Sequence, residues 1–163
     1  DGGHEVRRIE VARLEFPWLR TKDEFEKGTP PDSIKQAQDA IRWADHLVIF
    51  YPLWLGSMPA LLKAFLEQVF RPGVAFEYRA QGKMAKKLFT GKSARIVVTM
   101  GMPALVYRWF FLAHSLKSLE RNILAFCGIK PTRATLIGQV EGMNERQRAS
   151  WLDEMRGLGD VGK

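Results

Sequence analysis

The sequence is poor in the residues from which disulfides and metal centres are built. Its 163 residues include a single cysteine, Cys127. One cysteine excludes an intramolecular disulfide and any multi-cysteine metal site, and it is typical of a reducing compartment, so a cytoplasmic protein is expected. The three histidines, His4, His46 and His114, show no metal-ligand spacing with one another, with the cysteine or with a carboxylate. No metal site is therefore expected.

Long hydrophobic runs are also lacking. Residues 47–62, LVIFYPLWLGSMPALL, carry no charge, but they fall short of the 18 or more apolar residues that a membrane-spanning helix needs. Pro52, Gly56 and Pro59 interrupt this stretch. It is better explained as a buried strand, a loop and a helix, and no transmembrane segment or signal peptide is expected.

Several common catalytic and nucleotide-binding motifs are absent, and acidic residues are fewer than basic ones. There is no GxSxG nucleophile motif, no dinucleotide fingerprint and no phosphate-binding loop, because Gly91-Lys92-Ser93 lacks the upstream glycine and precedes a strand. Eighteen acidic residues stand against 25 basic ones, a net charge of +7. The basic residues are spread along the chain without a nucleic-acid motif, which favours a solvated surface, and no nucleic-acid partner is expected.

What is present is an alternation of strands and helices. β-branched and apolar runs predict parallel strands at about 5–11, 47–51, 95–99 and 132–137. Helical spacing predicts helices that begin at Asp32, at Ser57 and at about Ala104, the last broken near Ser115, and a final helix capped by Asn144. This order predicts an α/β fold, a doubly wound parallel sheet with helices on both faces, in one domain over 1–163.

Open parallel sheets bind ligands at the carboxyl ends of their strands, so the candidate ligand sites are Tyr51 to Ser57, Thr99 to Pro103 and the region after Ile137. The first two carry the clearest features. Residues 52–56 place Trp54 just ahead of a helix, and residues 99–102 contain Gly101, which permits close backbone approach. Backbone N–H groups there could donate to a planar heterocycle that an indole walls in. On this pattern alone, plain packing of the two loops is the open alternative.

Several segments resemble the NAD(P)H:quinone oxidoreductase family. They are Phe50-Tyr51-Pro52-Leu53-Trp54, Ser57-Met58-Pro59-Ala60-Leu61-Leu62-Lys63-Ala64, Val69-Phe70, Ala75-Phe76, Gly3-His4-Glu5-Val6 and Leu124-Ala125-Phe126-Cys127-Gly128. The resemblance covers nearly the whole chain and implies a flavodoxin-like fold. It also implies a ping-pong enzyme that passes hydride from NAD(P)H through a flavin to a quinone or similar acceptor. Because the chain ends soon after its last helix, FMN is favoured over FAD.

The resemblance also assigns site residues. Those implied to line the flavin ring are Pro52, Leu53, Trp54, Leu55 and Gly56 in the first loop and Thr99, Met100, Gly101 and Met102 in the second. Tyr107 and His114 are implied to stabilise charge on the reduced flavin, as a phenol and an imidazole can. Their alternatives are a helix residue with a solvated hydroxyl and a cation near the last carbonyls of a helix. Leu55 and the two methionines depart from the family pattern, which has a second aromatic and more glycine at these places.

The resemblance further implies a homodimer, for which Trp109, Phe110 and Phe111 are candidate contacts, although ordinary core packing is equally open. The family also includes ancillary proteins of potassium-efflux systems, so a non-catalytic regulatory subunit that binds a partner protein is the alternative function. A flavodoxin-like sheet has five strands in the order 2-1-3-4-5, and residues 5–11 match the second. We therefore expect an incomplete N-terminus, with a strand-helix unit of about 25–30 residues and its phosphate-binding loop upstream.

Overall fold

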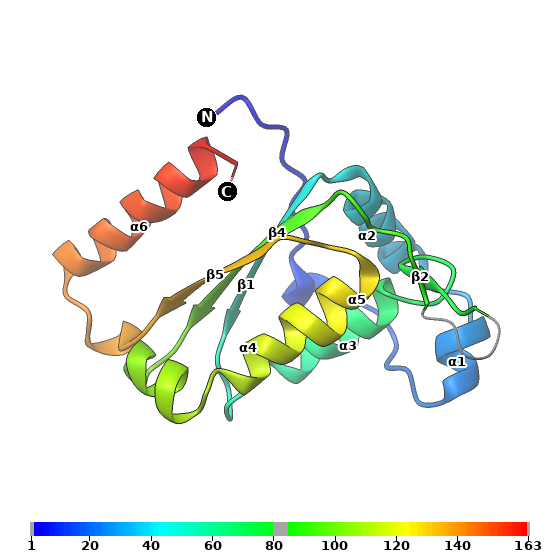
Figure 1. The fold of residues 1–163 in the computed structure, drawn as a ribbon, viewed down its shortest axis with the longest axis horizontal. Helices are drawn as coiled ribbons and strands as arrows, with labels where there is room; N and C mark the ends of the chain where they lie inside the picture. The colour runs from blue at the N-terminus through cyan, green and yellow to red at the C-terminus, as the bar shows by residue number, and fades with distance from the viewer. Residues whose placement is uncertain (1, 80–84, 163) are drawn as a thin grey trace.

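The computed structural model describes residues 2–79 and 85–162. Its centre is a parallel sheet in the order β1-β4-β5, made of β1 (His46–Pro52), β4 (Ser93–Thr99) and β5 (Thr132–Ile137) (Figure 1). The three predicted strands at 47–51, 95–99 and 132–137 are thus confirmed. Because all three strands run the same way, their carboxyl ends share one edge of the sheet, the carboxyl edge, and their starts share the opposite amino edge.

Helices and short segments fill the connections between these strands. They are η1 (Val11–Arg13), α1 (Lys22–Lys27), α2 (Asp32–Trp43), α3 (Ala60–Val69), β2 (Phe76–Glu77), β3 (Lys86–Lys87), η2 (Val106–Phe110), α4 (His114–Ser118), η3 (Leu119–Leu124), α5 (Ala125–Cys127), η4 (Val140–Gly142) and α6 (Glu145–Asp160). β2 and β3 form a separate antiparallel pair. The alternation of strands and helices confirms the predicted α/β class.

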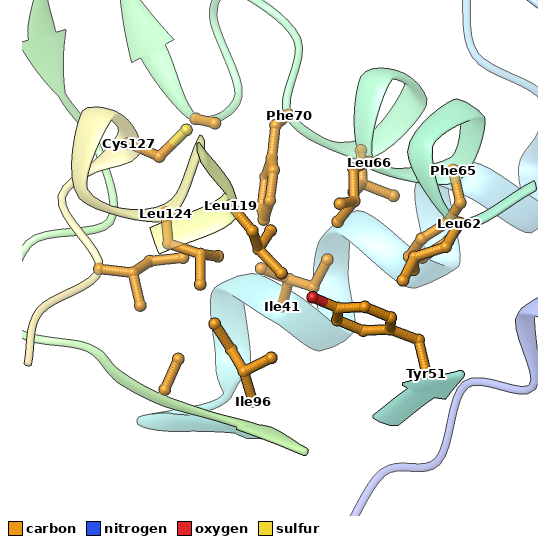
Figure 2. Packing of buried hydrophobic residues seen from close by; sticks show 14 of the residues in the cluster. Ile41, Tyr51, Leu62, Phe65, Leu66, Phe70, Ile96, Leu119, Leu124 and Cys127 are labelled. Atoms are coloured by element: carbon orange, nitrogen blue, oxygen red, sulfur yellow. The ribbon is translucent and has the colours of Figure 1, made fainter. Parts of the chain in front are cut away.

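The hydrophobic core lies on one face of the sheet. Ile96 of β4 is fully buried there, and Leu119 of η3 and Val69 of α3 are fully buried against the same cluster (Figure 2). Burying a side chain of this size stabilises a fold by about 1.5–3 kcal/mol. This face therefore supplies most of the packing that holds the strand ends in place.

Helix α6 lies on the other side of the sheet (Figure 1). As predicted, Asn144 caps it: the Asn144 side chain accepts a hydrogen bond from the Gln147 N–H, and the Gln147 side chain accepts one from the Asn144 N–H. No described residue of α6 is buried, and the outward residues Val48 and Phe50 of β1 are 50% and 63% exposed. This face is less closely packed than the core face.

Residues 5–11 do not form the predicted strand. The segment is irregular up to η1, although Ile9 and Val11 pack partly against the core. A β-strand exists only through backbone pairing, and no strand in the described part of the chain pairs with this segment. The prediction of a strand at residues 5–11 is therefore wrong.

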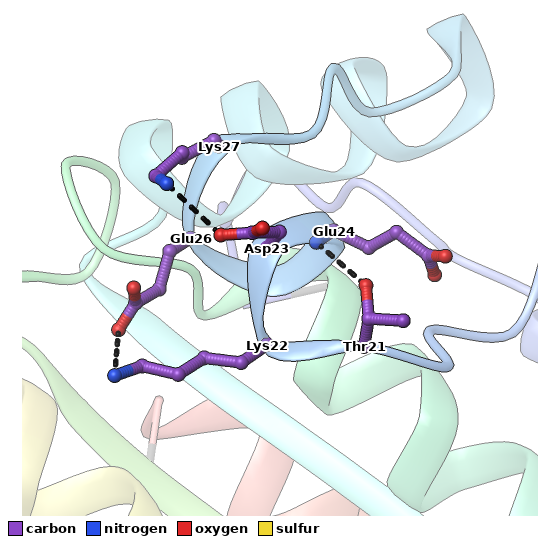
Figure 3. Close-up of polar contacts among 6 residues, drawn as sticks. All are labelled: Thr21, Lys22, Asp23, Glu24, Glu26 and Lys27. Atoms are coloured by element: carbon purple, nitrogen blue, oxygen red, sulfur yellow. Dashed lines mark hydrogen bonds and ion pairs between the residues drawn. The ribbon is translucent and has the colours of Figure 1, made fainter.

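A short helix, α1, follows this segment and is stabilised locally. Thr21 caps it by accepting a hydrogen bond from the Glu24 N–H at 3.1 Å (Figure 3). Ion pairs join Lys27 to Asp23 at 2.9 Å and Lys22 to Glu26 at 3.7 Å along its surface. A helix of six residues depends on such contacts, because helices this short are unstable alone.

Arg71, just after α3, ties the α1 region to the core. It is 5% exposed and donates hydrogen bonds to the carbonyl oxygens of Glu24 and Gly28, at 3.0 and 2.6 Å, and to the Gln68 side chain. Gln68 in turn donates to the Pro17 carbonyl at 2.6 Å. Burial lowers the Arg71 pKa, and the nearby charge of Glu24 opposes part of this shift.

Two helix boundaries differ from the predicted ones. Ser57 does not cap α3, which begins at Ala60, because the Ser57 backbone closes a turn with Trp54 instead. The predicted helix from about Ala104 is broken at Leu112 and Ala113, two residues before the expected break, where both residues adopt positive φ. On either side of this break the chain includes the π-helical segments η2 and η3.

Candidate functional site

The loops after β1 and β4 meet at the carboxyl edge. Pro52 and Thr99 are register partners at the ends of their strands, and the Leu53 N–H donates to the Thr99 carbonyl at 2.8 Å. The parallel ladder thus extends one residue into the first loop. The structure therefore brings the two predicted groups of flavin-lining residues together.

The first loop is a tight turn. The Trp54 and Ser57 backbones exchange two hydrogen bonds of 2.9 Å, and the central residues Leu55 and Gly56 both have positive φ, 47° and 75°. Positive φ at both central positions is the geometry of a type I′ turn. Trp54 is 63% exposed and Leu55 is fully exposed. The N–H groups of Leu55 and Gly56 make no hydrogen bond within the described residues, so two donors remain available on this loop.

The second loop is anchored by Met100, its second residue. Met100 is buried, and its N–H donates to the Ile137 carbonyl at 2.9 Å. Gly101 is exposed, whereas Met102 is half-buried against the core. Met100 therefore anchors the second loop, whereas Gly101 and the exposed part of Met102 are the residues that a ligand could contact.

A third loop, after β5, completes this edge. The N–H groups of Gln139 and Val140 donate to the carbonyls of Met102 and Met100, at 3.1 and 3.2 Å. A Cβ on Gly138 would lie 2.4 Å from the Ala104 nitrogen and 2.8 Å from the Met102 oxygen, so only glycine fits. The region after Ile137 was expected to lie at this edge, but no single residue in it was predicted to matter. A glycine directly after a predicted strand was the available signal.

Tyr107 occupies the core and not the loop surface. Its side chain is 2% exposed, its hydroxyl lies 2.7 Å from the Ser115 hydroxyl, and it accepts a hydrogen bond from the Leu116 N–H at 3.1 Å. The expectation of a solvated hydroxyl is wrong, because the chain reverses at Leu112 and Ala113 and folds over the ring. As positioned, the phenol joins η2 to α4.

His114 is exposed and lies at the start of α4. It also follows η2 closely, since its N–H donates to the carbonyl of Phe111, the residue at the end of η2, at 3.4 Å. It follows Leu112 and Ala113, whose left-handed backbones have φ of 53° and 47°. Such conformations are costly in non-glycine residues and are enriched at functional sites.

A cluster of exposed apolar side chains extends from the second loop. Its members are Leu105, Val106, Trp109, Phe110, Phe111 and Leu112, with exposed fractions from 41% to 79%. The rings of Phe110 and Phe111 pack edge to face, with centroids 5.0 Å apart. Ordinary core packing of Trp109 and these two rings is excluded, because the core lies elsewhere. We call this cluster the aromatic surface.

Tyr51 lies directly behind the first loop. It is 4% exposed and its hydroxyl has no hydrogen-bond partner among the described residues (Figure 2). Burial raises the Tyr51 pKa, and the nearby Tyr107 and Glu120 add to the rise. The phenol is therefore neutral at physiological pH.

The chemistry available at this edge is that of a binding surface for a planar group. It offers free N–H donors on Leu55 and Gly56, an exposed indole and an open approach at Gly101, and these fit the ring edge of a flavin. Within residues 2–79 and 85–162, no three His, Cys, Asp or Glu side chains gather closely enough to ligate a metal. Nor does any helix in those ranges have the length and apolarity needed to span a bilayer.

The chain is similar to a known family and to several known proteins. A family model described as a flavodoxin-like fold matches residues 1–157. An uncharacterized NAD(P)H oxidoreductase of Haemophilus influenzae is 28% identical over 157 residues, which span 94% of this chain and 77% of that protein. The FMN-dependent NADH:quinone oxidoreductase 1 of Hahella chejuensis is 35% identical over 114 residues, 63% of this chain and 52% of that protein.

Solved structures agree on the fold. A putative quinone reductase from Klebsiella pneumoniae superposes with a TM-score of 0.84 at 21% identity, covering 98% of this chain and 73% of that one. The resemblance to NAD(P)H:quinone oxidoreductases and the predicted flavodoxin-like fold are both confirmed.

Proposed function

The chain belongs to the flavodoxin-like fold family, and from this premise we propose that it is a flavin-dependent oxidoreductase. It takes hydride from NAD(P)H and delivers the electrons to a quinone or similar acceptor. The observation that carries the proposal is the pair of free N–H donors on Leu55 and Gly56 beside the open approach at Gly101. The names of the relatives support it, since one is an NAD(P)H oxidoreductase and another an FMN-dependent quinone oxidoreductase.

In this proposal the chain positions the ring and controls its surroundings. The N–H groups of Leu55 and Gly56 donate to polar atoms on the ring edge, and Trp54 covers one side. A flavin held by these residues would supply the hydride and electron transfer that the protein's own side chains lack. Both half-reactions use this one edge of the sheet, in keeping with a ping-pong order.

Tyr107 and His114 take different roles in the proposal. The Tyr107 hydroxyl is already engaged by Ser115 and Leu116, so it acts as a positioning residue for the η2–α4 segment. His114 is exposed next to that segment and is the one of the two whose ring can approach negative charge on a reduced ligand. We therefore assign charge stabilisation to His114.

The finer parts of the proposal are FMN as the flavin, a homodimer and a cytoplasmic location. FMN is supported by the Hahella relative, whose name specifies it. A homodimer is supported by the aromatic surface, which exposes more apolar area than single surface residues do. The location is supported by the single cysteine, Cys127, whose burial raises its thiol pKa to about 12 and keeps it unreactive.

The alternative is a regulatory subunit that retains the fold without turnover. The aromatic surface favours it equally, because a partner protein could cover the same side chains. Sedimentation of the purified protein distinguishes a homodimer from a subunit that binds a partner protein. A dimer at micromolar concentration supports self-association through the aromatic surface, and a monomer supports binding of a partner protein there.

Anaerobic reduction tests the function. The purified full-length protein, loaded with FMN, should lose its yellow absorbance when NADH or NADPH is added and regain it when a quinone such as menadione follows. Failure of both FMN and FAD to bind would sink the proposal. Flavin that binds but is not reduced would favour the regulatory alternative.

Two variants separate the assigned roles. His114→Ala should slow flavin reduction without changing the melting temperature, because the side chain is exposed. Tyr107→Phe should lower the melting temperature while changing the reduction rate less. The reverse pattern would return the direct role to Tyr107.

A further inference from the structure

A concave site lies away from the carboxyl edge. It is a groove of about 870 Å³, lined by Ala85, Lys87, Glu120, Arg121, Asn122, Ala125, Phe126, Lys130, Pro131 and Thr132. Thr132 is the first residue of β5, so the groove opens at the amino edge. The six residues of β5 rise about 3.3 Å each, which places the two sites roughly 17 Å apart or more. We call it the basic groove.

The basic groove carries more positive than negative charge. Lys87, Arg121 and Lys130 line it against one carboxylate, Glu120. Burial raises the pKa of Glu120, so its ionised form is disfavoured relative to an exposed glutamate. An anion would be attracted to these walls.

Two of the three cations are available to a ligand. Arg121 and Lys130 are exposed, and neither side chain makes an ion pair or hydrogen bond within residues 2–79 and 85–162. The third, Lys87, donates to the Ala125 carbonyl at 2.8 Å and thereby fixes one wall. An arginine fork and a lysine on one groove suit the oxygens of a phosphate.

The remaining wall is aromatic and neutral. Phe126 is 39% exposed, and its ring packs edge to face on the buried Phe76, with centroids 4.8 Å apart. This contact fixes the Phe126 ring while part of it still faces outward. Asn122 and Thr132 add neutral hydrogen-bonding groups. A planar ring could pack on such a wall.

From this combination we propose that the basic groove binds a nucleoside phosphate. The phosphate lies against Arg121 and Lys130, and the base packs toward Phe126. The volume falls within the roughly 300–1,000 Å³ of small-molecule pockets, which is enough for a nucleotide. A site at the amino edge could be filled while the carboxyl edge is occupied by flavin, so the ligand of the groove would be a regulator and not a substrate.

Calorimetric titration of the FMN-saturated, full-length protein tests this with three probes: ADP, adenosine and inorganic phosphate. ADP should bind at one site, about tenfold more tightly than either fragment, because only ADP engages both walls. Phosphate that binds as tightly as ADP would contradict a role for the aromatic wall, and the absence of saturable ADP binding would overturn the proposal.

A charge-matched pair of double variants locates the site. Arg121→Gln/Lys130→Gln should weaken ADP about tenfold or more, as expected for loss of charge-assisted hydrogen bonds. Arg146→Gln/Arg148→Gln on the exposed surface of α6 removes the same net charge and should leave ADP affinity unchanged. All four side chains are exposed, so circular dichroism should show intact folds. Unchanged affinity in the groove variant, or equal weakening in both, would overturn the assignment.

Discussion

The two edges of the sheet differ in which residues adopt a left-handed backbone conformation, with positive φ. At the amino edge, Gly91 precedes β4 and Gly128 precedes β5, and glycine takes each left-handed conformation. At the carboxyl edge and in the segment that follows it, Gly56 adopts such a conformation too, but so do four residues with side chains: Leu55, Leu112, Ala113 and Gln139. A left-handed backbone costs a non-glycine residue about 1–2 kcal/mol. Strain is therefore concentrated where the candidate site lies.

The two edges also differ in how far their backbone groups are hydrogen-bonded. At the amino edge, the Lys92 ammonium donates to the Arg42 and Ala44 carbonyls, at 2.6 and 2.5 Å, and closes the end of α2. At the carboxyl edge, the N–H groups of Leu55 and Gly56 are left without partners in the described chain. The difference indicates that the amino-edge backbone is closed for stability, whereas the carboxyl edge keeps backbone donors open for a ligand.

The largest expected effect is at the carboxyl edge, where the second loop packs closely against Gly138 of the third loop. In Gly138→Ala the new Cβ would lie 2.4 Å from the Ala104 nitrogen, so the second and third loops must separate. We expect a loss of at least about 3 kcal/mol in unfolding free energy, measured by urea denaturation, together with loss of FMN affinity.

The matched control for this variant is Gly142→Ala in η4. A Cβ on Gly142 meets nothing within 4 Å, so its stability and FMN affinity should stay near those of the parent protein. Equal stability of Gly138→Ala and Gly142→Ala would show that the loops are not packed as described.

At the amino edge, Gly128→Ala should destabilise by about 1–3 kcal/mol without changing FMN affinity. Gly128 has φ of 105°, and a Cβ there would lie 3.0 Å from the Thr90 nitrogen. Gly157→Ala within α6 meets no neighbour and should stabilise the protein by about 0.5–1 kcal/mol. If Gly128→Ala weakened FMN binding as much as it weakened stability, the two edges would not be independent.

The strands at 47–51, 95–99 and 132–137 and their end loops could be predicted because they depend on local pattern, whereas the strand predicted at 5–11 lacks a pairing partner among the described residues. Buried runs such as 95–99 read directly as strands, and Asn144 carries its cap beside it in the sequence. Features set by distant contacts could not be predicted. The pairing of Tyr107 with Ser115 depends on a reversal at Leu112 and Ala113, and no turn residue marks that reversal. The close approach at Gly138 likewise exists only once the second and third loops are assembled.

A smaller effect should come from relieving strain in the first loop. Leu55→Gly removes the cost of φ 47° but adds chain entropy to the unfolded state, for a net gain of about 0.5 kcal/mol in urea denaturation. Because the Leu55 side chain is fully exposed, no core contact is lost. FMN affinity should fall about tenfold if this side chain covers the ring. A destabilised variant would mean that the turn is not strained.

The smallest effect concerns pH at the amino edge. Burial, helped by the charges of Arg95 and Arg133, lowers the pKa of His46 below its usual 6.5. The folded protein therefore binds this proton more weakly than the unfolded chain. The corresponding stability should be present above about pH 6.5 and lost as the pH falls through the lower, folded pKa. His46→Gln should flatten this dependence in thermal melts, and an unchanged pH profile would assign it to other groups.

The most direct test of the account is an amide NMR titration of the protein with FMN. The account predicts that the resonances of Leu55, Gly56 and Gly101 shift on binding, because their backbones form the ring site at the carboxyl edge. Those of Arg121 and Lys130 in the basic groove should not move. Shifts confined to the groove, or no saturable shift at the carboxyl edge, would contradict the central claim that this edge is the flavin site.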